Sequence, residues 1–101
     1  MNWNILSNKD ILNEIGIRLR SYRINQKLTQ KELAEQSGVS LFPIVQMERG
    51  KSVSISNMLP VLRTLRLLDN LDLFLPEIPM SPIKLANLKG KMPKRIRKKD
   101  K

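Results

Sequence analysis

The side chains best suited to chemistry gather near the middle of this 101-residue chain. Gln46 carries an amide that can bond with the edge of an adenine, and Leu41 and Phe42 suit apolar contact with the methyl group of a thymine. Ser40 and Gln30 stand where helices are expected to begin, and the backbone donors of a helix start can bind phosphate oxygens. These residue types predict contact with double-stranded DNA. The expected contacts are Gln30, Ser40, Leu41, Phe42, Val45, Gln46, Arg49 and Lys51.

The same sequence offers little for catalysis or metal binding. It contains no Cys and no His, which excludes disulfides, thiol nucleophiles, imidazole bases and the usual zinc sites. It also lacks a glycine-rich phosphate loop, and its acidic residues are expected on helix surfaces. We therefore expect a protein that is not an enzyme and that uses no cofactor and no metal.

A capping box predicts the first of two short helices that would position the expected contacts. Thr29 and Glu32 stand three residues apart, so that the side chain of each can bond with the backbone N–H of the other. We expect this helix over residues 30–37. Gly38 follows at once, and glycine tolerates the left-handed conformation that ends a helix.

The second short helix is expected over residues 40–49, after a turn of only a few residues. Serine is favoured at the N-cap position of a helix, and Ser40 occupies that position here. Pro43 falls in the first turn, where its missing N–H costs no hydrogen bond within the helix. On a helical wheel, Ile44 and Met47 point towards the core, away from the expected DNA contacts. Two short helices joined by such a turn form a helix-turn-helix, whose second helix enters the major groove.

Three further helices complete the expected fold. Apolar side chains at helical spacing predict the first over residues 10–26. They are Ile11, Ile15, Leu19 and Tyr22. A fourth helix begins after Ser54 or Ser56, and Pro60 kinks it if the cap is Ser54. A short fifth helix is expected over residues 69–75.

Positive charge is concentrated at the end of the chain. Residues 1–79 carry ten Lys and Arg against eight Asp and Glu, whereas residues 80–101 carry nine against one. Prolines punctuate the chain from Pro76 onward, so we expect a helical domain over 1–75 and a flexible basic tail over 76–101. Three uses of the tail stay open, namely nonspecific DNA affinity, docking on an acidic partner, and folding on binding as a degradation-sensitive segment.

No export or membrane signal is expected. The start of the chain lacks a basic segment followed by a long apolar stretch, and no apolar run approaches the ~20 residues of a membrane span. We expect a cytoplasmic protein that does not interact with membranes.

Three stretches in the middle of the chain are similar to one family. They read RINQKLTQKELA at 23–34, GVS at 38–40 and IVQMERG at 44–50, and they resemble the Cro/cI (XRE) type of helix-turn-helix phage repressors. The resemblance implies an all-α fold of five helices, the lambda-repressor-like DNA-binding domain. It also implies a homodimer on a palindromic operator.

The resemblance assigns roles to single residues as well. By position, Gln30 matches the family's phosphate-binding glutamine. The family's base-facing positions fall on Ser40, Leu41, Phe42 and Gln46. Arg23 and Glu48 match an ion pair that ties the first helix to the third. The chain departs from most relatives at residues 41–43, where LFP replaces small polar residues, so its operator contacts are expected to be unusually apolar.

A narrower resemblance covers the second half of the chain. The segments LRLLDNLD at 65–72, LP at 75–76, SPIKL at 81–85 and KGK at 89–91 are similar to HipB-type antitoxins. This resemblance implies an autorepressor that also holds a HipA-type serine/threonine kinase toxin inactive.

A second copy of the chain is the other expected partner. Operator recognition by this fold normally uses two reading helices ~34 Å apart. We therefore expect the apolar side chains of the fifth helix to contact a second copy, although their spacing also fits a core. They are Leu71, Phe74 and Leu75. Two other functions stay open: a stand-alone phage-type regulator, and a protein-interaction module that binds through its tail.

Overall fold

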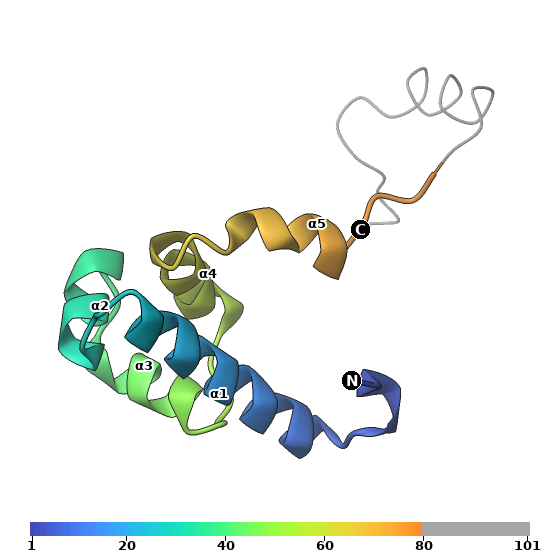
Figure 1. Ribbon diagram of the computed structural model, residues 1–101, viewed down its shortest axis with the longest axis horizontal. Coiled ribbons are helices and arrows are strands. Elements are labelled where there is room, and N and C mark those ends of the chain that lie inside the picture. The colour runs from blue at the N-terminus through green and yellow to red at the C-terminus, as the bar shows by residue number, and fades with distance from the viewer. Residues whose placement is uncertain (80–101) are drawn as a thin grey trace, which may run out of the picture. The chain divides into compact units, whose positions relative to one another are not determined.

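The computed structural model of the protein describes residues 1–79. Its helices follow one another in the order shown in Figure 1. They are η1 (Trp3–Ile5), α1 (Asn8–Asn25), α2 (Gln30–Ser37), α3 (Leu41–Glu48), α4 (Ile55–Thr64), η2 (Leu68–Asn70) and α5 (Leu71–Phe74), where η marks a 3-10 helix. The described part contains five α-helices and no strand, which confirms the predicted fold class.

The chain divides into two compact units. The first spans Met1–Leu71, whereas the second begins at Asp72. Most of the tail expected over 76–101 lies outside the described residues. Among residues 1–79, no helix combines the length and the apolar character needed to cross a membrane.

Side-chain caps set the starts of three α-helices. Thr29 and Glu32 form the predicted capping box: the N–H of Glu32 donates to Thr29 Oγ1 at 3.0 Å, and the N–H of Thr29 donates to Glu32 Oε1 at 2.8 Å. Ser7 caps α1 and Ser54 caps α4 through their hydroxyl oxygens. Because Ser7 is the cap, α1 begins at Asn8, earlier than expected.

The structure decides where the fourth helix begins and how the fifth helix is divided. Both Ser54 and Ser56 suited the start of the fourth helix, and the structure uses Ser54, which places Pro60 inside one continuous α4. The fifth helix, expected over 69–75, is instead divided into η2 and the single turn of α5. Pro76 disfavours helical backbone in the residue before it, so the chain leaves the helix after Phe74.

Two helices end at non-glycine residues in the left-handed backbone region. Lys27 follows α1 with a φ of 61°, and Arg66 follows α4 with a φ of 63°. Residues with a Cβ atom adopt this region at a cost of about 1–2 kcal/mol. Each site forms a closing hydrogen bond, from the N–H of Leu28 to the Arg23 carbonyl at 3.1 Å and from that of Leu67 to the Leu62 carbonyl at 2.8 Å. These bonds offset part of the conformational cost.

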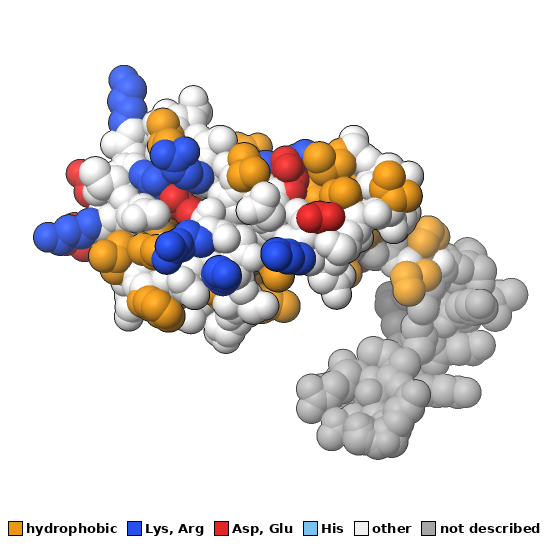
Figure 2. Space-filling model, turned by 90° about the horizontal axis from the view of Figure 1, so that it is seen from below, with side chains coloured by type: hydrophobic (Ala, Val, Ile, Leu, Met, Phe, Trp, Pro, Cys, Tyr) orange, Lys and Arg blue, Asp and Glu red, His pale blue; other side chains and the backbone are white. Residues whose placement is uncertain are grey.

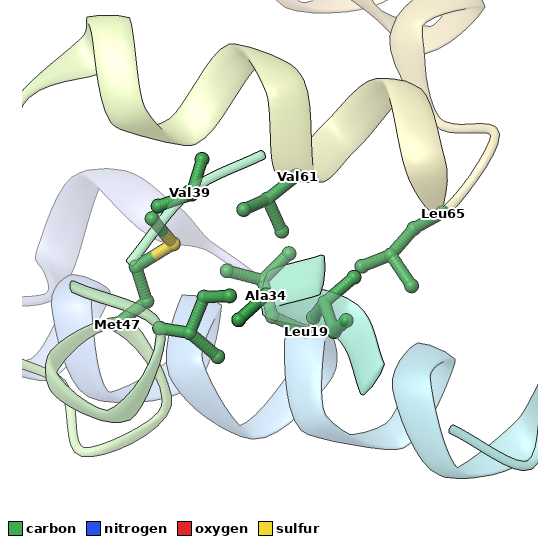
Figure 3. Packing of buried hydrophobic residues seen from close by; sticks show 8 residues of the cluster. Leu19, Ala34, Val39, Met47, Val61 and Leu65 are labelled. Atoms are coloured by element: carbon green, nitrogen blue, oxygen red, sulfur yellow. The ribbon is translucent and has the colours of Figure 1, made fainter. Parts of the chain in front are cut away.

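One apolar core joins α1, α2, α3 and α4, as Figure 3 shows. Its members are Leu19, Leu33, Ala34, Val39, Ile44, Met47, Val61 and Leu65. Burying a Leu, Ile or Val side chain stabilises the fold by about 1.5–3 kcal/mol. Because Ile44 and Met47 belong to this core, as predicted, the inner side of α3 is fixed against the other helices.

The inner side of α1 differs from the sequence-based prediction at one position. Leu19 is buried as expected, but Tyr22 is exposed, and the next residue, Arg23, is buried. Both residues follow Leu19 at a helical spacing, so periodicity could not choose between them. A buried Arg needs a paired charge, and α3 supplies it.

Candidate nucleic-acid interface

A short turn joins α2 to α3. Gly38 has a φ of 74°, the left-handed conformation predicted for the end of α2, and its N–H donates to the Ala34 carbonyl at 2.9 Å. Val39 is buried and anchors the turn in the core. Ser40 then leads into α3. The two helices and their turn therefore form the helix-turn-helix arrangement that the sequence predicts.

α3 has one buried side and one exposed side. Ile44 and Met47 face the core, whereas the side chain of Phe42 is 71% exposed and that of Leu41 is 45% exposed. The other expected DNA contacts also reach the surface: Ser40, Arg49 and Lys51 are exposed, and Gln30, Val45 and Gln46 are half-buried. The fold thus leaves every predicted contact at least partly accessible to a ligand.

Ser40 starts α3, but its side chain makes no capping hydrogen bond. The caps of α1, α2 and α4 all accept from the N–H of the third helical residue. In α3 the third residue is Pro43, which has no N–H. Ser40 therefore serves as a cap through its backbone conformation alone, and its hydroxyl is not used by its own helix.

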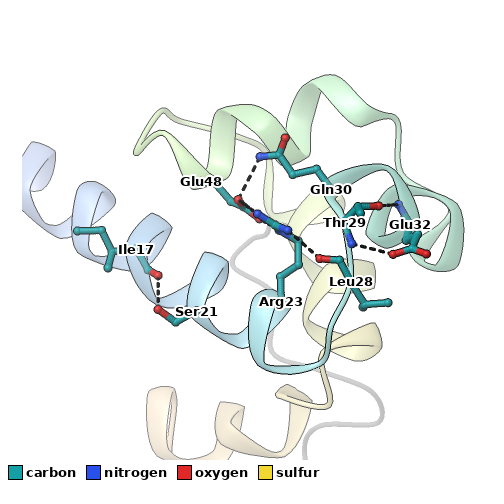
Figure 4. A network of polar contacts seen from close by, with 8 residues as sticks. All are labelled: Ile17, Ser21, Arg23, Leu28, Thr29, Gln30, Glu32 and Glu48. Carbon is teal, nitrogen blue, oxygen red and sulfur yellow. Dashed lines mark hydrogen bonds and ion pairs between the residues drawn. The ribbon is translucent and has the colours of Figure 1, made fainter.

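A buried ion pair holds the end of α3 to α1 (Figure 4). Arg23 Nε donates to Glu48 Oε2 at 2.6 Å, and Arg23 Nη2 donates to Glu48 Oε1 at 3.0 Å. Arg23 Nη1 donates to the Leu28 carbonyl at 2.7 Å, and Arg23 as a whole is only 9% exposed. The hydrogen bond with Glu48 raises the pKa of Arg23, so the guanidinium keeps its charge. The pair expected from the sequence is present, and it also fixes the turn before α2.

Gln30 takes part in the same network. Its Nε2 donates to Glu48 Oε1 at 3.1 Å, as Figure 4 shows. The sequence predicted only an outward role for Gln30, in phosphate binding. The side-chain amide of a glutamine has two N–H donors and a carbonyl oxygen. The bond to Glu48 uses one N–H and orients the amide, and the other N–H and the carbonyl oxygen can still bond with a ligand. Glu48 therefore links α3 to the first residue of α2 as well as to α1.

Gly16 is a positioning residue that sequence reasoning missed. A Cβ atom at this position would lie 2.5 Å from the carbonyl oxygen of Met47 and 2.9 Å from that of Glu48. The backbones of α1 and α3 thus touch directly, and any side chain at this point would force the two helices to shift. A glycine inside an otherwise regular helical pattern was the available signal, since it weakens a helix unless packing requires it.

Basic side chains lie near the carboxyl end of α3. Arg49 and Lys51 are exposed, and within residues 1–79 neither forms an ion pair with an acidic residue. Figure 2 shows one face of the molecule, on which hydrophobic side chains reach the surface between Lys and Arg side chains. Such a mixture suits a ligand that presents both phosphates and apolar groups.

One stretch of the chain matches a known protein family. Residues 19–68 match the helix-turn-helix family, a stretch that contains every expected DNA contact. These residues form a Cro/cI-type helix-turn-helix domain. No curated protein matches the chain. The helix-turn-helix domain marks the protein as a DNA-binding transcriptional regulator, and the family is not one of enzymes.

Proposed function

We propose that this regulator is a sequence-specific repressor that reads an operator with the exposed side of α3. The observation that supports the proposal is the division of α3 into two sides. Ile44 and Met47 are buried, while Phe42, Leu41 and the neighbouring polar groups stay accessible. A short helix held in this way by a helix-turn-helix is the element that enters the major groove.

Each expected contact has a role in this proposal. Gln46 forms a pair of hydrogen bonds with an adenine, and Val45 contacts a neighbouring base. Arg49 and Lys51 bind phosphates near the carboxyl end of α3, and Ser40 and Gln30 bind phosphates near helix starts. The unused hydroxyl of Ser40 and the oriented amide of Gln30 support these assignments.

We further propose that the repressor acts as a homodimer on a palindromic operator. The apolar side chains of Phe74 and Leu75 are both 72% exposed, and Leu71 is half-buried. Exposed apolar side chains in a row favour contact with another chain over membership of the core. A second copy joined there would present two reading helices to successive turns of the duplex.

A kinase partner is the most specific part of the proposal. The similarity of residues 65–72 to HipB-type antitoxins supports an autorepressor that inhibits a HipA-type kinase. We expect a kinase of this type, encoded beside the regulator, to lose autophosphorylation when the two proteins are mixed. Unchanged autophosphorylation in the complex would contradict the kinase partner, and the protein would then be a stand-alone regulator.

Binding to duplexes from the promoter of the protein's own gene tests the repressor. We expect the full-length chain to prefer one promoter segment to random duplex of equal length. Gln46→Ala should relax the preference at one base pair at a cost of about 1–3 kcal/mol, whereas Lys51→Ala should weaken binding to all sequences and lower the salt slope by about one. Equal affinity for promoter and random duplex would overturn the proposal.

A further inference from the structure

The first turn of α3 exposes two large apolar side chains beside one hydroxyl. Phe42 is 71% exposed, Leu41 is 45% exposed, and Ser40 is the adjacent polar residue. Neighbouring apolar side chains exposed on one surface often mark a binding site, and this pair lies on the helix that we propose to enter the major groove. Pro43 follows directly, and its ring fixes the backbone φ in the same turn.

Chemistry narrows what these side chains can recognise. Leu41 and Phe42 have no side-chain donor or acceptor, so they cannot read the hydrogen-bonding groups of the bases. The edge of a base pair in the major groove carries one apolar substituent, the methyl group on C5 of thymine. A cytosine methylated at C5 carries the same group at the same position. Hydrogen-bonding readout of the bases along the exposed side of α3 is therefore left mainly to Gln46.

We propose that Phe42, together with Leu41, recognises the C5-methyl group of a pyrimidine in the major groove. This inference rests on the proposed DNA-binding function, and it names one chemical group of the operator that α3 recognises. Methyl contacts replace part of the hydrogen-bond readout and make the affinity of the protein depend on pyrimidine methylation. The basic side chains of Arg49 and Lys51 at the other end of α3 hold the duplex through its phosphates.

The test uses the full-length protein and synthetic duplexes. A preferred site is first selected from a randomised pool of about 25 base pairs, which is long enough for two half-sites one helical turn apart. Dissociation constants are then measured for that site, for versions with single thymines replaced by deoxyuridine, and for versions with single cytosines replaced by 5-methylcytosine. Deoxyuridine removes only the methyl group and keeps the base pair.

We expect deoxyuridine at one position of the half-site to weaken binding about fourfold, the value of one buried methyl group. Phe42→Ala should bind the thymine and deoxyuridine duplexes equally. Ile5→Ala is the matched control, because Ile5 is 78% exposed and lies in η1, away from the helix-turn-helix. This variant should keep the fourfold difference, and circular dichroism should show that both variants are folded.

The outcomes separate this inference from the function on which it rests. Failure to select any site from the pool overturns the proposed function. A selected site that is bound equally with thymine and with deoxyuridine at every position, and equally with cytosine and with 5-methylcytosine, overturns the methyl contact but leaves the function. A fourfold difference that persists in Phe42→Ala assigns the methyl contact to another residue and overturns the inference. A loss of affinity at deoxyuridine identifies thymine as the source of the methyl group. A gain of affinity at 5-methylcytosine that Phe42→Ala abolishes identifies the modified cytosine as the source.

Discussion

Removal of the Glu48 carboxylate is the sharpest test of how α3 is held. In Glu48→Ala, Arg23 would stay buried with its charge but would lose the two hydrogen bonds of 2.6 and 3.0 Å that Glu48 accepts. Gln30 would lose its bond to the same carboxylate. Breaking a buried ion pair by removing one partner costs about 3–5 kcal/mol, because the remaining charge is uncompensated. A domain of this size has only about 5–15 kcal/mol of unfolding free energy, so the loss would be large.

Urea unfolding followed by circular dichroism measures this cost. Glu14→Ala is the matched control, because Glu14 pairs with Arg18 at 2.9 Å on the surface of α1. Exposed pairs contribute about 0–1 kcal/mol, so the control should lose little. The double variant Arg23→Met with Glu48→Met should recover much of the stability, since no buried charge remains. If Glu48→Ala were no less stable than Glu14→Ala, the buried network would not be what positions α3.

Three further substitutions test other features of the fold. Gly16→Ala should destabilise the protein by about 1–3 kcal/mol in thermal melts, because its Cβ would lie 2.5 Å from the Met47 carbonyl oxygen; an unchanged melting temperature would contradict the close contact. Lys27→Gly should raise the unfolding free energy by up to about 1 kcal/mol, since glycine adopts the φ of 61° without strain, and a loss of stability would count against this reasoning. Ser40→Ala should leave the unfolding free energy almost unchanged, whereas Ser54→Ala should lower it by about 1 kcal/mol, because only Ser54 makes a side-chain cap; equal losses would show that Ser40 caps α3 after all.

Local sequence alone determined the helix-turn-helix. The capping box of Thr29 and Glu32, the left-handed Gly38 and the burial of Ile44 and Met47 all match the prediction. Each depends on bonds or periodicity within a few residues of the chain, so no knowledge of distant contacts was needed. The missing side-chain cap of Ser40 follows from the same local chemistry, although the sequence analysis overlooked it.

Tertiary structure decided the features that join segments far apart in the chain. Periodicity allowed Tyr22 or Arg23 to face inward, and the carboxylate of Glu48 on α3 made Arg23 the buried residue. The bond from Gln30 to Glu48 and the contact of Gly16 with α3 depend on how closely the helices approach. Such distances result from packing the whole core at once, which a one-dimensional pattern does not specify.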